Sequence, residues 1–384
     1  MPRCYVVPGL AGSELFRDAA LTRLLWVSYT QLLLSGVGPL RLGPDGVSPG
    51  PPDGVPLYAG APLPDYYEQA TVQLAAALGP HGYDTFTHGY DWRLSTRITG
   101  PQLAARLRTE VSPADPCSLV CHSLGGLVAR LAWADLVRTG ETALVRRIIT
   151  IGTPHWGSYA AVRLWSLDSE VSSQISFLSW LTATYYTVPV AIAAGLIWTP
   201  TRIAALASTW PSLYETLPSL LAPDAGSDPG RASIYMGQWP ADRGVRADLL
   251  ADAVNVFQPL MADVSTQPPS WVMTTVAGIG ESTVGALVAP WLLGSARAYR
   301  VAGDGDTTVQ RSSALLDNSA QYTIGGCHGD LPEIAAGLPA AAQAVLDPRG
   351  PPGPAPPPVA VPGSTPYERH GPPFPGPFGP PLDP

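Results

Sequence analysis

Lysine is absent from the 384-residue chain, so all 22 of its basic residues are arginines, and only 14% of the residues carry a charge. Thirty acidic residues leave a net charge of −8. Because a protein that binds nucleic acid needs a clustered positive surface, this composition argues against nucleic acid as a partner. With 46% hydrophobic residues, the chain has the composition of a lightly charged globular protein.

Cysteine is also scarce, and the four that occur are spaced neither for a zinc site nor for a disulfide-rich scaffold. We therefore expect reduced, mostly buried thiols, no metal and no other cofactor. Because an apolar run begins directly after Arg3, we expect no charged leader with an apolar stretch and a cleavage site. We expect a cytoplasmic protein with at most peripheral membrane contact. The cysteines are Cys4, Cys117, Cys121 and Cys327.

One long segment, residues 171–201, contains no charged side chain. Its part from Ile175 to Trp198 is long enough to cross a bilayer, but hydroxyl residues interrupt it and Pro189 would break a helix in mid-span. Three interpretations remain: a membrane span, ordinary buried core, or an apolar cap that covers a lipid pocket or touches a membrane surface. We favour the cap.

The end of the chain, residues 347–384, holds 16 prolines among 38 residues. Such a segment cannot form helices or strand ladders, so we expect a disordered or polyproline tail. It serves either as a solubilising extension or as a ligand for a proline-binding module.

Short apolar runs alternate with helical patterns over most of the remaining chain, which predicts an α/β fold with a mostly parallel sheet flanked by helices. The alternation stops from about residue 158 to 268, and eight of the eleven tryptophans lie between Trp156 and Trp291. We interpret this stretch as an inserted apolar cap. The expected strands are residues 4–8, 117–121, 147–151, 271–277 and 298–301, and the expected helices are 64–78, 100–110, 125–139 and 331–345. The expected units are core residues 1–157, cap 158–268, core residues 269–346 and tail 347–384.

The sharpest local motif is Cys-His-Ser-Leu-Gly-Gly at residues 121–126, between an expected strand and an expected helix. A serine on such a turn projects its hydroxyl above the sheet, and the residues two before and two after it must be small. Ser123 is therefore the candidate nucleophile. The N–H of Leu124, at the start of the helix, is one expected oxyanion donor, and the glycine-rich loop after the first strand offers Ala11 or Leu10 as the second.

A serine nucleophile needs a histidine base, which in turn needs a carboxylate to hold it. His328 lies in a glycine-rich loop before the last expected helix and is the favoured base, and His155 is the alternative or else lines the pocket. Spacing does not decide between Asp304 and Asp306 as the acid. A calcium loop at these aspartates lacks the remaining ligand positions.

These segments together resemble the lecithin:cholesterol acyltransferase family, which includes phospholipid:diacylglycerol acyltransferases and related phospholipases with the α/β-hydrolase fold. The resemblance implies that Asp306 is the acid and that Trp92 lies near the acyl pocket. It also implies that the Trp-bearing residues 21–40 contact lipid surfaces. The matching segments are residues 6–13 (Val-Val-Pro-Gly-Leu-Ala-Gly-Ser), 90–93 (Tyr-Asp-Trp-Arg), 122–126, 303–309 and His328.

We therefore expect an acyl-serine enzyme that acts on a lipid ester, by resemblance a glycerophospholipid, and passes the acyl group to water or to an alcohol. Trp92, His155 and Trp156 are the expected substrate-binding residues. Residues 21–40 and 171–201 are the expected places of peripheral membrane contact. The alternatives are a general carboxylesterase or triacylglycerol lipase, and a catalytically silent membrane-binding or scaffolding protein.

Overall fold

The structure is a computed structural model. Part of each predicted membrane-contact segment and most of the predicted tail lie outside the residues it describes. The described residues are 1–26, 28, 31, 36–166, 200–228, 230–236, 239–290, 298–301, 304–337, 339–347 and 359–360. Within these ranges, no helix combines the length and the apolar character that a membrane span requires.

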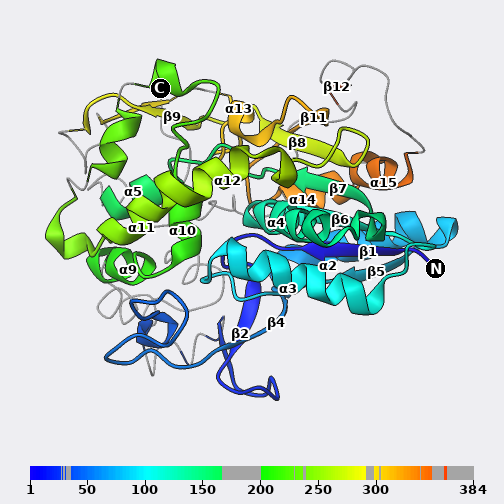
Figure 1. Ribbon diagram of the computed structural model, residues 1–384, viewed down its shortest axis with the longest axis horizontal. Helices are drawn as coiled ribbons and strands as arrows, with labels where there is room; N and C mark the ends of the chain where they lie inside the picture. The colour runs from blue at the N-terminus through cyan, green and yellow to red at the C-terminus, as the bar shows by residue number, and fades with distance from the viewer. Residues whose placement is uncertain are drawn as a thin grey trace, which may run out of the picture.

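A seven-stranded sheet forms the centre of the molecule, and all its neighbouring strands run parallel in the order β12-β11-β8-β7-β6-β1-β5 (Figure 1). The predicted α/β fold with a mostly parallel sheet is confirmed. The strands are β1 (Arg3–Val7), β5 (Asp84–Thr87), β6 (Cys117–His122), β7 (Val145–Ile151), β8 (Met273–Ile279), β11 (Ala320–Gly325) and β12 (Val359–Ala360).

Helices cover both faces of this sheet, as the sequence of its first strand requires. Tyr5 and Val7 pack into a core with α3 and α4, whereas Cys4 and Val6 pack on the opposite face with α2, α14 and α15. The side chains of β1 are thus apolar on both faces of the sheet, as is usual for a parallel strand that helices cover on both sides. The covering helices are α2 (Pro64–Leu78), α3 (Thr96–Glu110), α4 (Leu124–Thr139), α14 (Leu331–Gly337) and α15 (Pro339–Leu346) (Figure 1).

Three expectations about the secondary structure are wrong. Residues 298–301 were expected as a buried strand of the parallel sheet, but β10 (Tyr299–Val301) pairs antiparallel with β9 (Val284–Leu287) outside it. The expected helix 331–345 is two helices, α14 and α15. In the tail, β12 pairs with β11 although a ladder was excluded there, because Val359 and Ala360 are free of the restriction that proline imposes.

A small antiparallel sheet and an irregular loop lie between the first strand and α2. This sheet has the order β3-β2-β4 and extends away from the central sheet (Figure 1). Its strands are β2 (Ser13–Phe16), β3 (Leu24–Trp26) and β4 (Tyr58–Pro62).

The stretch predicted as a cap lies between β7 and β8, and its described part is mostly helical. Its side chains Trp165, Trp210 and Leu213 belong to the same hydrophobic core as Trp26 and Trp92, so this part packs directly on the sheet domain. Its α- and π-helices are α5 (Ala160–Ser166), α9 (Pro200–Ala207), α10 (Pro211–Glu215), α11 (Ala247–Asp252), η7 (Ala253–Phe257) and α12 (Gln258–Ala262); α13 (Arg311–Ala314) follows later in the chain.

A buried carboxylate joins this insertion to the core. Glu215, the last residue of α10, accepts hydrogen bonds from Ser95 Oγ at 2.5 Å and from the backbone N and Oγ1 of Thr96 at 2.7 Å each. Ser95 is the N-cap of α3, so the carboxylate lies at the positive end of that helix.

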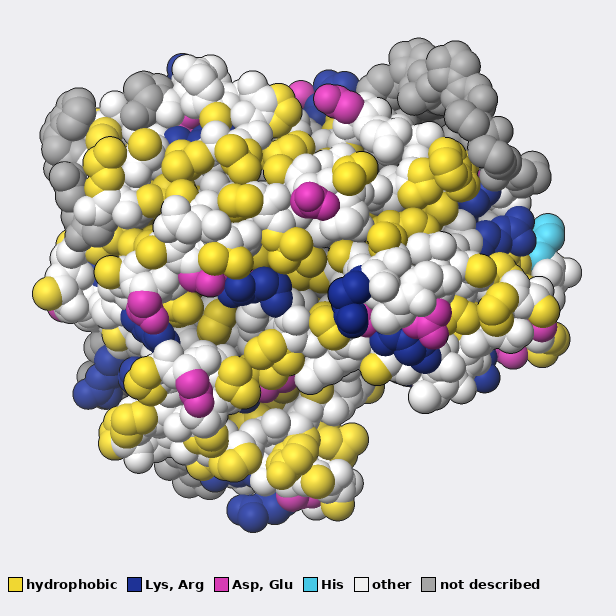
Figure 2. All heavy atoms as spheres, viewed as in Figure 1, with side chains coloured by type: hydrophobic (Ala, Val, Ile, Leu, Met, Phe, Trp, Pro, Cys, Tyr) yellow, Lys and Arg dark blue, Asp and Glu magenta, His cyan; other side chains and the backbone are white. Residues whose placement is uncertain are grey.

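The surface agrees with the low charge content. On the face that Figure 2 shows, apolar side chains are widely spread, and arginines lie next to acidic side chains. On this face the charges of the two signs are mixed, and no continuous basic patch is seen.

Buried histidines should make stability fall on the acid side. Burial, helped by the charge of Arg106, lowers the pKa of His88 to about 4. The unfolded chain, with a histidine pKa of about 6.5, takes up a proton first, so stability is lost as pH falls from about 6.5 towards 4. His88→Asn keeps an acceptor for Arg106. Over this pH range its unfolding free energy is expected to fall by about 3 kcal/mol less than that of wild type.

Urea unfolding at pH 7 and pH 4.5, followed by tryptophan fluorescence, measures the effect. Wild type should lose more unfolding free energy than His88→Asn between these two pH values. His81→Asn, at an exposed position, is the control and should behave as wild type does. Equal losses in wild type and His88→Asn would show that His88 does not contribute.

Candidate active site

Ser123 lies on a sharp turn between β6 and α4, in the backbone conformation that the motif predicts. Its φ of +52° and ψ of −125° belong to a region that residues other than glycine rarely adopt. Two residues later, a Cβ on Gly125 would come within 2.5 Å of the carbonyl oxygen of Pro8. A glycine at position 125 is therefore a requirement of packing against the end of β1.

The structure brings Ser123, His328 and Asp306 into one hydrogen-bonded chain. His328 Nε2 lies 2.9 Å from Ser123 Oγ, and its Nδ1 lies 2.7 Å from Asp306 Oδ2. Asp306 is fully buried and His328 nearly so. This is the order of groups that lets a hydroxyl pass its proton to an imidazole whose other nitrogen is held by a carboxylate.

The carboxylate of Asp306 is oriented by its own turn. Its Oδ1 accepts the backbone N–H groups of Thr308 at 3.0 Å and Val309 at 2.6 Å, which leaves Oδ2 for the histidine. Asp304, the alternative acid, is half exposed and lies 3.4 Å from the guanidinium of Arg311 at the surface. The structure therefore places Asp306, and not Asp304, beside His328.

Asp306 stands at the end of β8, although 26 residues separate it from the strand's last residue, Ile279. Gly305 forms β-bridges with Glu281 and Gln310, and Glu281 donates its N–H to the Gly305 oxygen at 3.1 Å. The β9–β10 hairpin is thus an arm that leaves β8 and returns the chain to the same edge of the sheet.

A cavity of about 90 Å³ opens beside Ser123 and His328. Leu10, Ala11 and Leu124, the expected oxyanion donors, are in its wall. Ala11 has a left-handed backbone, with a φ of +59°. Apolar side chains make most of the remaining wall, among them Trp26, Leu63, Tyr66, Leu213 and Val309.

The three residues expected to bind substrate lie elsewhere. Trp92 is fully buried between Trp26 and Trp210, with ring centroids 5.3 and 5.0 Å away, and does not reach the cavity. His155 is buried with its Nε2 3.0 Å from Thr150 Oγ1, and Trp156 is also absent from the cavity wall.

The segment that carries Trp92 instead contacts the loop of the expected oxyanion donors. Trp92 Nε1 donates to the carbonyl of Ser13 at 3.1 Å, and Tyr90 Oη donates to the carbonyl of Pro8 at 2.9 Å. Sequence reasoning gave no role at the cavity to Leu63, Tyr66, Tyr67 or Leu213, because nothing in the local sequence indicates which buried side chains of a helix meet a distant loop.

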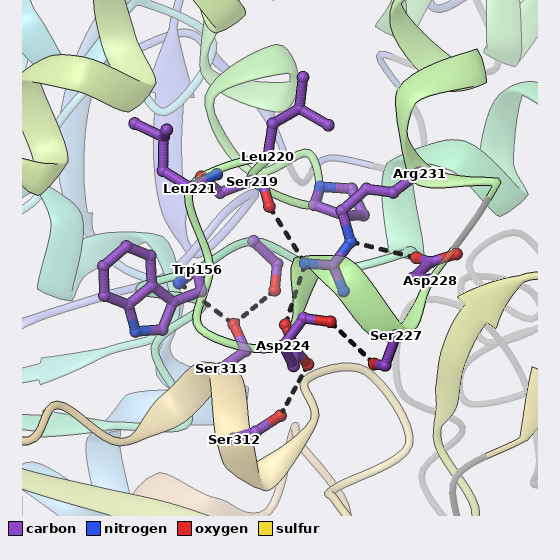
Figure 3. A network of polar contacts seen from close by, with 12 residues as sticks. Trp156, Ser219, Leu220, Leu221, Asp224, Ser227, Asp228, Arg231, Ser312 and Ser313 are labelled. Atoms are coloured by element: carbon purple, nitrogen blue, oxygen red, sulfur yellow. Dashed lines mark hydrogen bonds and ion pairs between the residues drawn. The ribbon is translucent and has the colours of Figure 1, made fainter.

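A polar network connects the insertion to the segment that follows Asp306, where Ser312 Oγ donates to Asp224 at 3.4 Å, and to β9, which precedes it (Figure 3). The buried guanidinium of Arg231 donates to Asp228 at 3.1 Å, to Asp224 at 3.0 Å and to the carbonyl of Ser219 at 3.1 Å. Asp228 also accepts the backbone N–H of Leu287 in β9 at 3.1 Å. The loop at residues 219–231 is thereby fixed against the β9–β10 arm.

A parallel sheet covered on both faces, with Ser123 on the turn after β6, Asp306 at the end of β8 and His328 after β11, is the arrangement of the α/β-hydrolase fold. In sequence, the chain matches no family model. A comparison with curated proteins gives no match either.

Among solved structures, the chain is similar to lipase BlEst2 of Bacillus licheniformis in its mature form, with 17% identity over 90% of this chain and 91% of the lipase and a TM-score of 0.38. EstA from Clostridium botulinum shows 12% identity over 90% of this chain and 87% of EstA, with a TM-score of 0.39. Membership of the lecithin:cholesterol acyltransferase family stays a prediction.

Proposed function

We propose that this protein is a serine-dependent enzyme that cleaves carboxylic esters of lipids through an acyl-serine intermediate. The observation that carries the proposal is the alignment of Ser123 Oγ, His328 Nε2 and Asp306 Oδ2 at the wall of an apolar cavity. A scaffolding protein without catalytic activity has no need for this arrangement.

The chemistry follows from the geometry. Ser123 Oγ attacks the ester carbonyl while its proton moves to His328 Nε2, and Asp306 stabilises the imidazolium that results. The N–H of Leu124 and that of Ala11 or Leu10 stabilise the oxyanion. The intermediate then expels the alcohol, which takes the proton from His328. Water, or a second alcohol, attacks the acyl-serine with His328 as base and restores the free hydroxyl.

The apolar cavity wall supports a lipid substrate, because an acyl chain gains free energy when it leaves water for such a surface. The choice of a glycerophospholipid is based on the sequence resemblance. A general carboxylesterase or triacylglycerol lipase would use the same catalytic groups. We also propose that residues 21–40 and 171–201 contact a lipid surface peripherally and that the proline-rich tail is either a solubilising extension or a ligand for a proline-binding module.

Product analysis tests the function. The protein and its Ser123→Ala variant are mixed with phosphatidylcholine vesicles that contain diacylglycerol, and the lipids are analysed by mass spectrometry. Free fatty acid that depends on Ser123 is expected for hydrolysis, and triacylglycerol for acyl transfer. Ser118→Ala is the matched control: within the described residues, the buried Ser118 hydroxyl has no hydrogen-bond partner, so activity should be unchanged.

Other outcomes separate the alternatives. Turnover of a p-nitrophenyl butyrate substrate without any lipid product would favour a general carboxylesterase. If neither an ester nor a fluorophosphonate probe reacts at Ser123, the enzymatic proposal is wrong and a binding role takes its place.

A further inference from the structure

A second series of hydrogen bonds lies beside Ser123, at the wall of the same cavity, and involves two residues that the mechanism above does not use. The phenolic oxygen of Tyr67, in α2, lies 2.8 Å from His122 Nδ1 and accepts the backbone N–H of Gly9 at 2.9 Å. His122 Nε2 lies 3.0 Å from the carbonyl oxygen of His328. Tyr67 and His122 are both buried.

The protons of this series can be assigned from the partners alone. A carbonyl only accepts, so His122 carries its proton on Nε2 and donates it to the His328 oxygen. Nδ1 of the neutral ring then has a lone pair and accepts the Tyr67 hydroxyl proton. The Tyr67 oxygen keeps a lone pair for the Gly9 N–H. Every donor therefore has an acceptor, and all three hydrogen bonds are donated in the same direction, from Gly9 towards His328.

The protonation states agree with this assignment. Burial, followed by the nearby His328, lowers the pKa of His122 well below its usual range, so the ring is neutral. Burial raises the pKa of Tyr67, which therefore remains a phenol. The His122 and His328 rings lie 4.8 Å apart between centroids, so a charged His122 would oppose the positive charge that His328 acquires during catalysis.

These hydrogen bonds end on two loops, and the reaction depends on the distance between those loops. At one end is the loop of the oxyanion donors: a Cβ on Gly9 would lie 2.8 Å from Ser123 Cβ, so this loop already touches the nucleophile. At the other end is the backbone of the base, since His328 also donates its own N–H to the Asp306 carbonyl oxygen at 2.7 Å. The base is thus held on both sides of its backbone.

We propose that Tyr67 and His122 are positioning residues: together they fix the oxyanion loop relative to the base across Ser123. This inference rests on the proposed ester chemistry. His122 does not itself act as a base, because both of its ring nitrogens are engaged, Nδ1 by Tyr67 and Nε2 by the carbonyl oxygen of His328. A misplaced oxyanion donor weakens stabilisation of the transition state more than binding of the ester, so the effect belongs in kcat.

The test is Tyr67→Phe, which keeps the ring and removes only the hydroxyl. Tyr83→Phe is the matched control, since the buried Tyr83 hydroxyl has no hydrogen-bond partner among the described residues. With a p-nitrophenyl ester and active-site titration, kcat of Tyr67→Phe should fall about 10- to 100-fold while KM changes less than about twofold. The kcat/KM ratio of an oxyester to its thionoester should fall as well, because it reports on oxyanion stabilisation.

The outcomes distinguish the positioning role of Tyr67 and His122 from the proposed function. If wild type shows no turnover that depends on Ser123, the ester chemistry is wrong and the positioning role with it. If wild type is active and Tyr67→Phe is equally active, or loses kcat without a change in the ratio of oxyester to thionoester, the positioning role alone is wrong.

If Tyr67→Phe does not fold, the nitrogen-15 shifts of His122 in wild type decide the question. A neutral ring with its proton on Nε2 from pH 8 to pH 5 supports the positioning role. A ring that becomes protonated near pH 6 contradicts it.

Discussion

Asp306→Asn is expected to lower kcat for ester hydrolysis by about 10⁴-fold. The reason lies in the turn that holds the side chain. Oδ1 accepts two backbone N–H groups, so an asparagine would keep its oxygen there and present its NH₂ group to His328 Nδ1. His328 would then carry its proton on Nε2, where it has to accept the proton of Ser123.

The matched control is Asp304→Asn, two residues earlier in the same loop. Asp304 lies half exposed beside Arg311, so its substitution should leave kcat within about twofold. Initial rates with a p-nitrophenyl ester, normalised to folded protein by circular dichroism, give the comparison. Equal losses in the two variants would contradict the role of Asp306 and indicate a general distortion of the loop.

The second large effect concerns stability. Glu215→Ala is expected to lower the free energy of unfolding by about 3 kcal/mol. It leaves the hydroxyls of Ser95 and Thr96 and one N–H at the start of α3 without their acceptor in a buried site. Part of the loss is offset, because burial raises the pKa of Glu215 and therefore opposes its ionised form.

Denaturant unfolding at pH 7 measures this loss. Glu215→Gln keeps one acceptor oxygen and should fall between wild type and Glu215→Ala. Asp248→Ala removes an exposed ion pair with Arg246 and should cost less than about 1 kcal/mol. A Glu215→Ala variant as stable as Asp248→Ala would show that the insertion does not depend on this contact.

The sequence predicted those elements whose signals are local. The helix at residues 64–78 has its expected bounds, because Pro64 starts it and its apolar spacing continues to Leu78. β5 was missed because its Asp-Thr-Phe-Thr sequence lies at an edge of the sheet and is only partly buried. β10 was assigned to the wrong sheet, since a short apolar run does not show which strand it pairs with.

The same distinction applies to the site. Ser123 and His328 could be proposed from local motifs, and spacing left Asp304 and Asp306 open until their surroundings were known. The polar contacts of Trp92 and Tyr67 join segments that lie more than 50 residues apart. Such contacts depend on how α2 and the oxyanion loop pack in space, and no periodicity in the sequence encodes them.

The pairing of Gly305 with Glu281 also affects how the sequence of this protein can change. Since the chain pairs again with the backbone just beyond β8 before it reaches Asp306, the distance from Asp306 to His328 depends on that backbone pairing and not on the number of residues in the arm. The β9–β10 arm can therefore gain or lose residues at its tip while the reacting groups keep their spacing. Residues on the surface of this arm can therefore be substituted during evolution without a change in the spacing of Asp306 and His328.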